Sequence, residues 1–530
     1  MVTKAPQPQK SGSSSQMQMQ TRTNKDPARR ITQILAGQLF DSVSRSLVPL
    51  QVVTVDEDQG IILDVAPQDS VRSIEEILGL GGEGGQREVE IDLKRVNLST
   101  QIILPGLVDV HVHFFLHPYS ETSWEDQVTR ESLAERTIRA TVHARKTLMA
   151  GFTTVRDLGT EGALDADIAL RKSLSGKNPI IPGPRYYCST RAIVASGSYG
   201  PRNHLTPSQN GVNGVTGAEA VDGADECAKE VRKQIGAGAD WIKIYADYRV
   251  RAGMGDVAPS IAAKSYSTFS KPELQALITT AHRRGVKVAA HANTPHTIRD
   301  LLDLEVDSVE HGPEMYNPDF ADRSLLRRLA GSDTIWVPTL SVFYTSWMMN
   351  PESKEIKYLW ERCQTTFKEA IGVGNRNIDT DFDAAWEPSV VNNIACGGDT
   401  GVFAHGKNAL ELVLMRRLGA KWNQVLGWAT FGGWRCIRGM EWDGSGGDRR
   451  VARLESMAAQ AFDPSDRDGP VNLDRDVPFG VIRPGWAADL VGVEGKLDGT
   501  AEEFEDALTQ GIKFVMKGGR IYKNEGTELV

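Results

Sequence analysis

The sequence predicts an α/β protein: a (β/α)8 barrel of the TIM type, beside a small β-domain that both chain ends build. Three observations carry this prediction. Between residues 105 and 440, eight short apolar strand patterns alternate with helical patterns, which is typical of βα units around a parallel sheet. Both chain ends carry strand patterns instead. Eight strands over about 300 residues also match the size of a barrel.

The eight predicted barrel strands are, in chain order, LVDVHVHFF, GFTTVRDLG, RYYCSTRAIV, DWIKIYA, VKVAAHA, VDSVEHG, TIWVPTLSV and NIACGGDTG. Helical patterns lie between them. One is SKPELQALITTAHRRG, residues 270–285, where Ser270 and Glu273 have the spacing of a capping box at a helix start.

The prediction divides the chain into four parts. Residues 1–30 are polar and lack the apolar stretch of a secretory signal, so we expect a disordered tail; an organellar presequence is the alternative. Residues 31–104 and 479–530 are expected to build the small β-domain, and residues 105–440 the barrel. Residues 441–478 are charged and rich in turn formers, which predicts a surface insertion.

The overall charge excludes some partners. The chain has 60 Lys and Arg against 69 Asp and Glu, a net charge of −9. That balance gives no reason to expect nucleic acid as a partner, and no run of about 18 apolar residues predicts a membrane span. The five cysteines are scattered without paired spacing. This predicts a reducing, cytoplasmic location and argues against disulfides and a cysteine zinc site.

Two histidines stand two residues apart in the first barrel strand, GLVDVHVHFF. Side chains at i and i+2 of a strand project to the same side, so His111 and His113 must share a polar partner. Four further polar residues recur at the ends of later strands: Lys243 in WIKIY, His291 in AAHANT, His311 in SVEHGPE and Asp399 in ACGGDTG. Barrel enzymes place their chemistry at these carboxyl ends.

Imidazole and carboxylate are ligands that divalent transition metals prefer, and catalytic sites leave positions open for water. Four histidines and one aspartate are too many for one such ion, so the pattern suits two. An unmodified ammonium beside two cations would be repelled. Lys243 is therefore expected to carry carbon dioxide as a carbamate whose two oxygens bridge the metals. The alternative is a lysine that pairs with a neighbour such as Asp247.

These segments together resemble the amidohydrolase superfamily, in the imidazolonepropionase-like branch that includes prolidase-type and ochratoxinase-type enzymes. The matching pieces are GLVDVHVHF, GFTTVRDLG, DWIKIYADYR, VAAHANTP, VDSVEHG, GGDTGVFAHG and RPGWAADLV. The resemblance as a whole spans roughly residues 30–525. The chain departs from several relatives in one place: it reads His291-Ala-Asn-Thr, where they carry a second histidine.

The resemblance implies that residues 31–104 and 479–530 form a composite β-sandwich domain. It also implies a role for each of the six residues. His111 and His113 would hold the more buried metal, and His291 and His311 the second one. Lys243, as its carbamate, would bridge the pair, and Asp399 would be both a ligand and the catalytic general base and acid. Zinc is the default metal for such a ligand set.

Four residues in loops after the strands are predicted to contact substrate: His204, Tyr248, Arg249 and His405. Arg249 would bind a carboxylate through two hydrogen bonds, and His204 or His405 would polarise a carbonyl. The alternative for each is a loop residue that ties down its neighbours.

The predicted function is therefore hydrolysis of a carbon–nitrogen bond of a small-molecule amide, such as an N-acyl amino acid or a dipeptide-like amide, by a homo-oligomeric enzyme. Three alternatives stay open at this point. One is hydrolysis of a cyclic amide or imidazolone, and another is a non-catalytic scaffold that keeps the fold. A lyase or isomerase that uses the same metals is a third.

Overall fold

The computed structural model describes residues 28–79, 90–176, 178–199, 217–249, 265–372, 391–457 and 474–530. The predicted N-terminal tail lies outside the described residues, apart from its last three positions. Among the helices in these ranges, none is long and apolar enough to cross a lipid bilayer.

Both chain ends join in a single sheet. Its strand order is β19 (Thr527–Glu528), β18 (Arg520–Asn524), β17 (Ile512–Lys517), β16 (Leu490–Val493), β4 (Ile91–Pro105), β1 (Arg29–Asp41), β2 (Ser46–Asp56) and β3 (Ile61–Pro67). The two ends meet where β4 pairs with β16, at Pro105 opposite Leu490.

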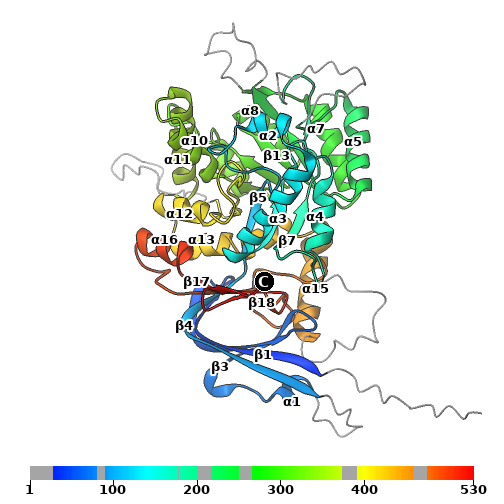
Figure 1. Cartoon of the computed structure of the whole chain (residues 1–530). Coiled ribbons are helices and arrows are strands. Elements are labelled where there is room, and N and C mark those ends of the chain that lie inside the picture. The colour runs from blue at the N-terminus through cyan, green and yellow to red at the C-terminus, as the bar shows by residue number, and fades with distance from the viewer. Residues whose placement is uncertain are drawn as a thin grey trace, which may run out of the picture.

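This sheet curls over itself. Its edge strand β3 forms an antiparallel bridge from Ile61 to Ala487, just before β16, and Figure 1 shows β17 and β18 as a layer above β1 and β4. Apolar side chains such as Ile34, Ile103 and Phe514 are fully buried between the layers. The expected composite β-domain is therefore one continuous sheet folded on itself, with alternate residues facing its core.

Parallel strands form the central α/β domain in two sheets. The first has the order β5 (Leu107–Val112), β6 (Phe152–Asp157), β7 (Arg185–Cys188). The second has the order β15 (Ile335–Val337), β14 (Ser308–His311), β13 (Lys287–Ala292), β10 (Trp241–Tyr245), β8 (Ile193–Val194), β9 (Glu219–Ala220). A short antiparallel pair, β11 (Asp247–Arg249) and β12 (Ser265–Ser267), follows β10.

Two of the eight predicted barrel strands differ from expectation. The third is split into β7 and β8, which belong to different sheets, because Thr190 adopts a positive φ of 60° between them. The eighth, from residue 393, is held by isolated bridges, Trp336 to Ile394 and Val112 to Thr400. It passes so close to the first strand that a Cβ on Gly397 would lie 2.8 Å from Cβ of His111, which explains its glycines.

Helices cover the parallel strands on several sides (Figure 1). They are α2 (Trp124–Arg130), α3 (Leu133–Met149), α4 (Ala166–Leu174), α5 (Ala224–Ala237), α7 (Lys271–His282), α8 (Pro295–Asp303), α9 (Ser324–Ala330), α10 (Leu340–Met349), α11 (Lys354–Ala370), α12 (Ala409–Arg417), α13 (Trp422–Trp428) and α14 (Phe431–Ile437). The capping box predicted for α7 is present, since Ser270 N donates to Glu273 Oε2 at 2.7 Å.

Three further helices and two 3-10 turns complete the described chain. They are α1 (Ile74–Ile77), α15 (Gly444–Met457) and α16 (Ala501–Thr509), with η1 (Gln68–Ser70) and η2 (Met440–Trp442). The predicted insertion 441–478 thus begins with a helix, and its two described ends are not wholly at the surface. Trp442 and Val477 are buried in one apolar cluster with Trp434, because large apolar side chains gain free energy when they leave water.

Candidate metal centre

All six residues predicted to form the metal site line one cavity. The cavity has a volume of about 720 Å³ and lies at the carboxyl ends of β5, β10, β13 and β14. Its wall includes His111, His113, Lys243, His291, His311 and Asp399. Residues far apart in the sequence therefore converge at the end of the strands where the sequence analysis expects them.

Strand β5, with the residue that follows it, and the end of the eighth predicted strand supply the tightest group. Nε2 of His113 lies 3.2 Å from Oδ1 of Asp399, and Nε2 of His111 lies 3.6 Å from the same oxygen. Ligand atoms of these three residues all lie within 4.8 Å of one another. The two imidazole rings are 5.4 Å apart, as the i and i+2 spacing predicts.

Each of three histidines has one ring nitrogen held by the protein. Nδ1 of His111 lies 2.8 Å from the Glu310 carboxylate, and Nδ1 of His113 lies 2.8 Å from the carbonyl oxygen of Gly159. Nδ1 of His311 lies 2.7 Å from the Thr339 hydroxyl. A proton held on Nδ1 leaves the lone pair on Nε2, which is how metal-binding histidines are usually oriented.

His291 and His311 form the other half of the group. Their rings are 4.5 Å apart and nearly perpendicular, and the His311 ring is 5.3 Å from that of His111. Nε2 of His291 accepts a hydrogen bond from the side-chain amide nitrogen of Asn293 at 2.9 Å. The four imidazoles therefore form a continuous row along the cavity wall.

Asp399 is held in a left-handed conformation, with a φ of 60°. The neighbouring loop is fixed by the buried carboxylate of Asp109, which accepts hydrogen bonds from Gly398 N at 3.2 Å and Asn408 Nδ2 at 2.7 Å. Burial raises the pKa of Asp109 to about 6, although these donors oppose the rise. A conformation that is uncommon outside glycine persists only where such contacts determine it.

The charges of the site favour an ionised Asp399. Burial alone opposes ionisation, but the interactions of Asp399 with His111, His113 and Lys243 outweigh it and hold the pKa of Asp399 well below its usual range. Burial also lowers the pKa values of His111, His291 and His311 well below the usual value for histidine. His113 differs, because burial opposes its protonation but the Asp399 carboxylate outweighs this effect and raises the pKa of His113 to about 9. Neutral imidazoles and an anionic carboxylate are the forms that bind divalent metals.

Lys243 is buried in the middle of β10. Burial lowers its pKa to about 8, with a further contribution from Arg156, whereas Glu310 and Asp399 oppose the change. Asp247, the alternative partner considered for Lys243, instead accepts hydrogen bonds from the backbone of Asn293 and Thr294. The lysine amine is therefore easier to deprotonate than an exposed one.

The rest of the cavity wall is aromatic and acidic. Glu161, which is 3% exposed and has a φ of 50°, accepts hydrogen bonds from Trp124 Nε1 at 3.0 Å, Tyr245 Oη at 3.2 Å and Tyr199 Oη. These residues were not singled out from the sequence as a group. The only signal was a carboxylate shortly after the second strand, which is common in loops.

Of the four residues predicted to contact substrate, one lines the cavity, one is buried elsewhere, and the side chains of the other two lie outside the described residues. Tyr248 lines the cavity, and its ring lies 5.5 Å from that of His291. His204 lies outside the described residues, and so does the side chain of Arg249, whose backbone belongs to β11. His405 is buried away from the cavity: its Nε2 bonds to the carbonyl oxygen of Leu116 at 3.0 Å, and its ring stacks on His143. That environment matches the alternative of a residue tying down its neighbours.

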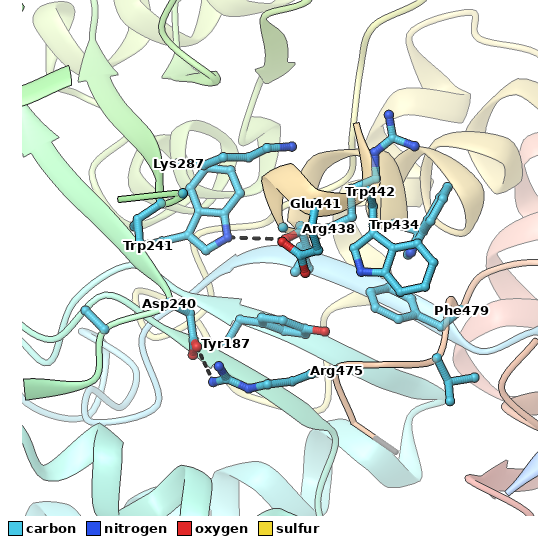
Figure 2. A pocket seen from close by; sticks show the side chains of 16 residues that line it. Tyr187, Asp240, Trp241, Lys287, Trp434, Arg438, Glu441, Trp442, Arg475 and Phe479 are labelled. Carbon is cyan, nitrogen blue, oxygen red and sulfur yellow. Dashed lines mark hydrogen bonds and ion pairs between the residues drawn. The ribbon is translucent and has the colours of Figure 1, made fainter. Parts of the chain in front are cut away.

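A second, smaller cavity of about 170 Å³ lies near the first residues of β10 and β13, at the other end of these strands (Figure 2). The indoles of Trp241, Trp434 and Trp442 are part of its wall. Several charged groups around it are paired. Arg475 pairs with Asp240 (Figure 2), and Lys287 and Arg438 pair with Asp443. Because most of its charged groups are paired within the protein, we assign this cavity no chemistry.

Known proteins share this architecture. The crystal structure of Aspergillus niger ochratoxinase is 21% identical to the chain, with a TM-score of 0.65 over 94% of this chain and 96% of that one. A Xaa-Pro dipeptidase with bound methionine is 23% identical, with a TM-score of 0.64 over 93% of this chain and 100% of that one. The fold is therefore the TIM-barrel type of the amidohydrolases, although hydrogen bonds divide its strands into two sheets here.

The sequence comparison leads to the same class. The model of the amidohydrolase family matches residues 102–438, and the chain belongs to this family. Ochratoxinase from Aspergillus niger is 23% identical over 460 residues, which cover 84% of this chain and 81% of the relative. An uncharacterized protein of Mycobacterium tuberculosis is 24% identical over 375 residues, which cover 69% and 80%. The resemblance recognised in the sequence is thereby confirmed, and the chain is a hydrolase of this family.

Proposed function

We propose that this chain is a binuclear metal-dependent hydrolase that cleaves the amide C–N bond of a small molecule. The observation that carries the proposal is the convergence of His111, His113 and Asp399, whose ligand atoms lie within 4.8 Å of one another. His291, His311 and Lys243 line the same cavity. Such a group of buried polar side chains needs a common partner, and a pair of cations fits it.

The donor set fits two divalent ions, with zinc as the first choice. His111, His113 and Asp399 would hold one ion, His291 and His311 the other, and Lys243 would lie between them. Nitrogen and oxygen donors of this kind suit zinc, and also manganese, cobalt, iron and nickel. The Nδ1 partners of three histidines support the fit, because they leave Nε2 as the donor atom.

Lys243 is proposed to bridge the ions as a carbamate. Its neutral amine nitrogen forms a bond to the carbon of carbon dioxide and releases one proton, which leaves a carboxylate-like anion. The lowered pKa of about 8 supports this step, because only the neutral amine reacts. The anion also removes the repulsion that an ammonium would experience beside two cations.

The metal pair, when bound, supplies a nucleophilic water at neutral pH and polarises the carbonyl of the substrate. Asp399 accepts the proton that this water loses. The contact of its carboxylate with Nε2 of His113, at 3.2 Å, holds the carboxylate in position for this transfer. It then delivers the proton to the leaving nitrogen as the C–N bond breaks.

The proposed substrates are N-acyl amino acids and dipeptide-like amides. The Xaa-Pro dipeptidase with a similar fold acts, by its name, on a dipeptide, which contains an amide bond. The cavity volume of about 720 Å³ is large enough for a compound of that size. Tyr248, Arg249 and His204 are proposed to contact the substrate, with Arg249 binding its carboxylate. A homo-oligomeric, cytoplasmic enzyme stays part of the prediction.

A metal analysis followed by a substrate panel tests this function. We expect close to two divalent ions per chain in the protein purified without chelator. We expect the metal-replete enzyme to hydrolyse N-acyl amino acids or X-Pro dipeptides faster than cyclic imidazolones, with Lys243→Ala as the comparison. A wild-type chain that binds no metal would reject the binuclear centre. Turnover of imidazolones alone would favour the cyclic-amide alternative.

A further inference from the structure

Behind the metal-binding face, two fully buried charged residues connect His111 to the interior of the strands. Nδ1 of His111 lies 2.8 Å from Oε2 of Glu310, and Oε1 of Glu310 accepts a hydrogen bond from Arg156 Nη2 at 2.8 Å. Glu310 precedes the predicted ligand His311 on β14, and Arg156 lies on β6. Both side chains are 0% exposed.

The N–H groups of the Arg156 guanidinium donate hydrogen bonds to two further partners besides Glu310. Its Nε donates to the carbonyl oxygen of Val110 at 2.7 Å, and its Nη1 donates to Ser308 Oγ at 2.9 Å. Its guanidinium lies 4.4 Å from the ring centre of Trp241, whose indole also lines the smaller cavity (Figure 2). Arg156 is therefore fixed in position, and it holds Glu310 at the point where His111 needs an acceptor.

We propose that Glu310 and Arg156 are positioning residues for the metal centre, which set the orientation and donor strength of His111. This inference rests on the proposed function. Glu310 keeps the proton of His111 on Nδ1, so that Nε2 carries the lone pair, and its negative charge makes the imidazole a stronger donor. Arg156 fixes the carboxylate and balances its charge, because an unpaired buried carboxylate would be costly.

The partner of His111 differs from those of the neighbouring histidines. Nδ1 of His113 faces the neutral carbonyl of Gly159, and Nδ1 of His311 faces the neutral hydroxyl of Thr339. Only the His111 contact, among these three, involves a charged acceptor. The ion held by His111 is therefore the one that depends on Glu310, whereas the ion held by His291 and His311 does not.

Metal titration of Glu310→Gln tests the inference independently of turnover. The full-length protein is stripped with a chelator and titrated with Co²⁺ in the presence of a competing chromophoric chelator. We expect about a 10- to 100-fold weaker affinity for one of two ions, the usual effect of losing such a partner, and a changed visible spectrum for that ion. The second ion should bind as in the wild type.

Glu131→Gln is the matched control. Glu131 Oε1 lies 2.7 Å from Nε2 of the buried His117, so the variant weakens the same kind of histidine–glutamate contact at a histidine that does not line the cavity. It should bind both ions as tightly as the wild type. If Glu310→Gln does not fold, because Arg156 loses its counter-charge, the double variant Arg156→Met with Glu310→Gln replaces it.

Wild-type affinity for both ions in Glu310→Gln or in the double variant would overturn the inference and leave the proposed function intact. An equal loss in Glu131→Gln would also overturn it, because the effect would then be a general loss of stability. A wild-type protein that binds no Co²⁺ would reject the proposed function itself.

Discussion

Nδ1 of His311 and Oγ1 of Thr339 lie 2.7 Å apart, and both side chains are buried. Thr339 stands at the start of α10 with a positive φ of 48°, and His311 ends β14 with a positive φ of 73°. Two uncommon backbone conformations are therefore joined through one hydrogen bond. Their side chains meet only because both segments turn sharply at the same end of the sheet.

Thr339→Val should weaken the ion held by His291 and His311. Valine keeps the shape of threonine but cannot accept the Nδ1 proton, so His311 would no longer be restricted to one tautomer. We expect a loss of about 10-fold in affinity for that ion, at the lower end of the range for such partners. Co²⁺ titration measures it. Thr339→Ser should restore the wild-type affinity, and a weakened ion at His111 instead would contradict the assignment.

Asp399→Asn should abolish most of the turnover. Asparagine cannot accept the proton of the attacking water, and general base catalysis of this kind contributes about 10²- to 10⁴-fold. The fall should appear in kcat at saturating metal. Asp319→Asn, an exposed position, is the control and should keep wild-type kcat. A variant of Asp399 that retains more than about a tenth of the activity would exclude the proposed base.

Lys243→Ala should lose activity that a small carboxylic acid partly restores. The variant leaves a space in which acetate can provide the two oxygens of the proposed carbamate. We expect hydrolysis to rise with acetate concentration in the variant and to stay constant in the wild type. A variant that is as active as the wild type without acetate would remove the carbamate from the mechanism.

Arg249→Met should raise KM for substrates that carry a free carboxylate. The guanidinium is proposed to bind that group through two hydrogen bonds, and such charged contacts contribute about 1.5–3 kcal/mol, or roughly 10- to 150-fold in KM. The matching amide with an esterified carboxylate should show no difference between variant and wild type. Equal effects on both substrates would mean that Arg249 orders its own loop.

Protonation of His143 should lower the free energy of unfolding at acid pH. Its Nδ1 lies 2.8 Å from the carbonyl oxygen of Phe114, and burial lowers its pKa to about 4. Because the unfolded chain binds this proton near pH 6.5, the free energy of unfolding should fall as the pH drops from 6.5 to 4. The difference in the free energy of unfolding between the wild type and His143→Gln, measured by urea titration, should decrease by up to about 3 kcal/mol over that range.

His282 should give the opposite pH dependence of the free energy of unfolding. Its hydrogen bond to Asp307, at 2.7 Å, raises its pKa. The stabilisation from this pair is fully present below the unfolded pKa and is lost as the pH rises through the folded one. The difference in the free energy of unfolding between the wild type and His282→Gln should therefore increase as the pH falls. A difference that does not depend on pH for either variant would contradict both assignments.

Local patterns were sufficient to predict the six residues of the candidate metal centre. His111 and His113 lie on one side of a strand because the strand repeats every two residues, and their residue types indicate the chemistry. That these residues converge on one cavity agrees with the sequence analysis, while their function as ligands stays a prediction.

Features that depend on contacts between distant segments were not predicted. Glu310 and Arg156 look in the sequence like ordinary charged residues within apolar strands, and only the pairing of strands brings them to His111. The break between β7 and β8 depends on one backbone angle at Thr190. The burial of Trp442 depends on a partner, Trp434, from another helix.

The pairing of β4 with β16 has a consequence for how the chain is made. β1 and β4 leave the ribosome early, but the strand that completes their sheet follows only after the whole catalytic domain. Until then, apolar side chains such as Ile103 stay uncovered, and an open strand edge of this kind invites association between nascent chains. Assembly of the N-terminal region must therefore await the end of translation, and premature termination before residue 490 would release a protein prone to aggregation.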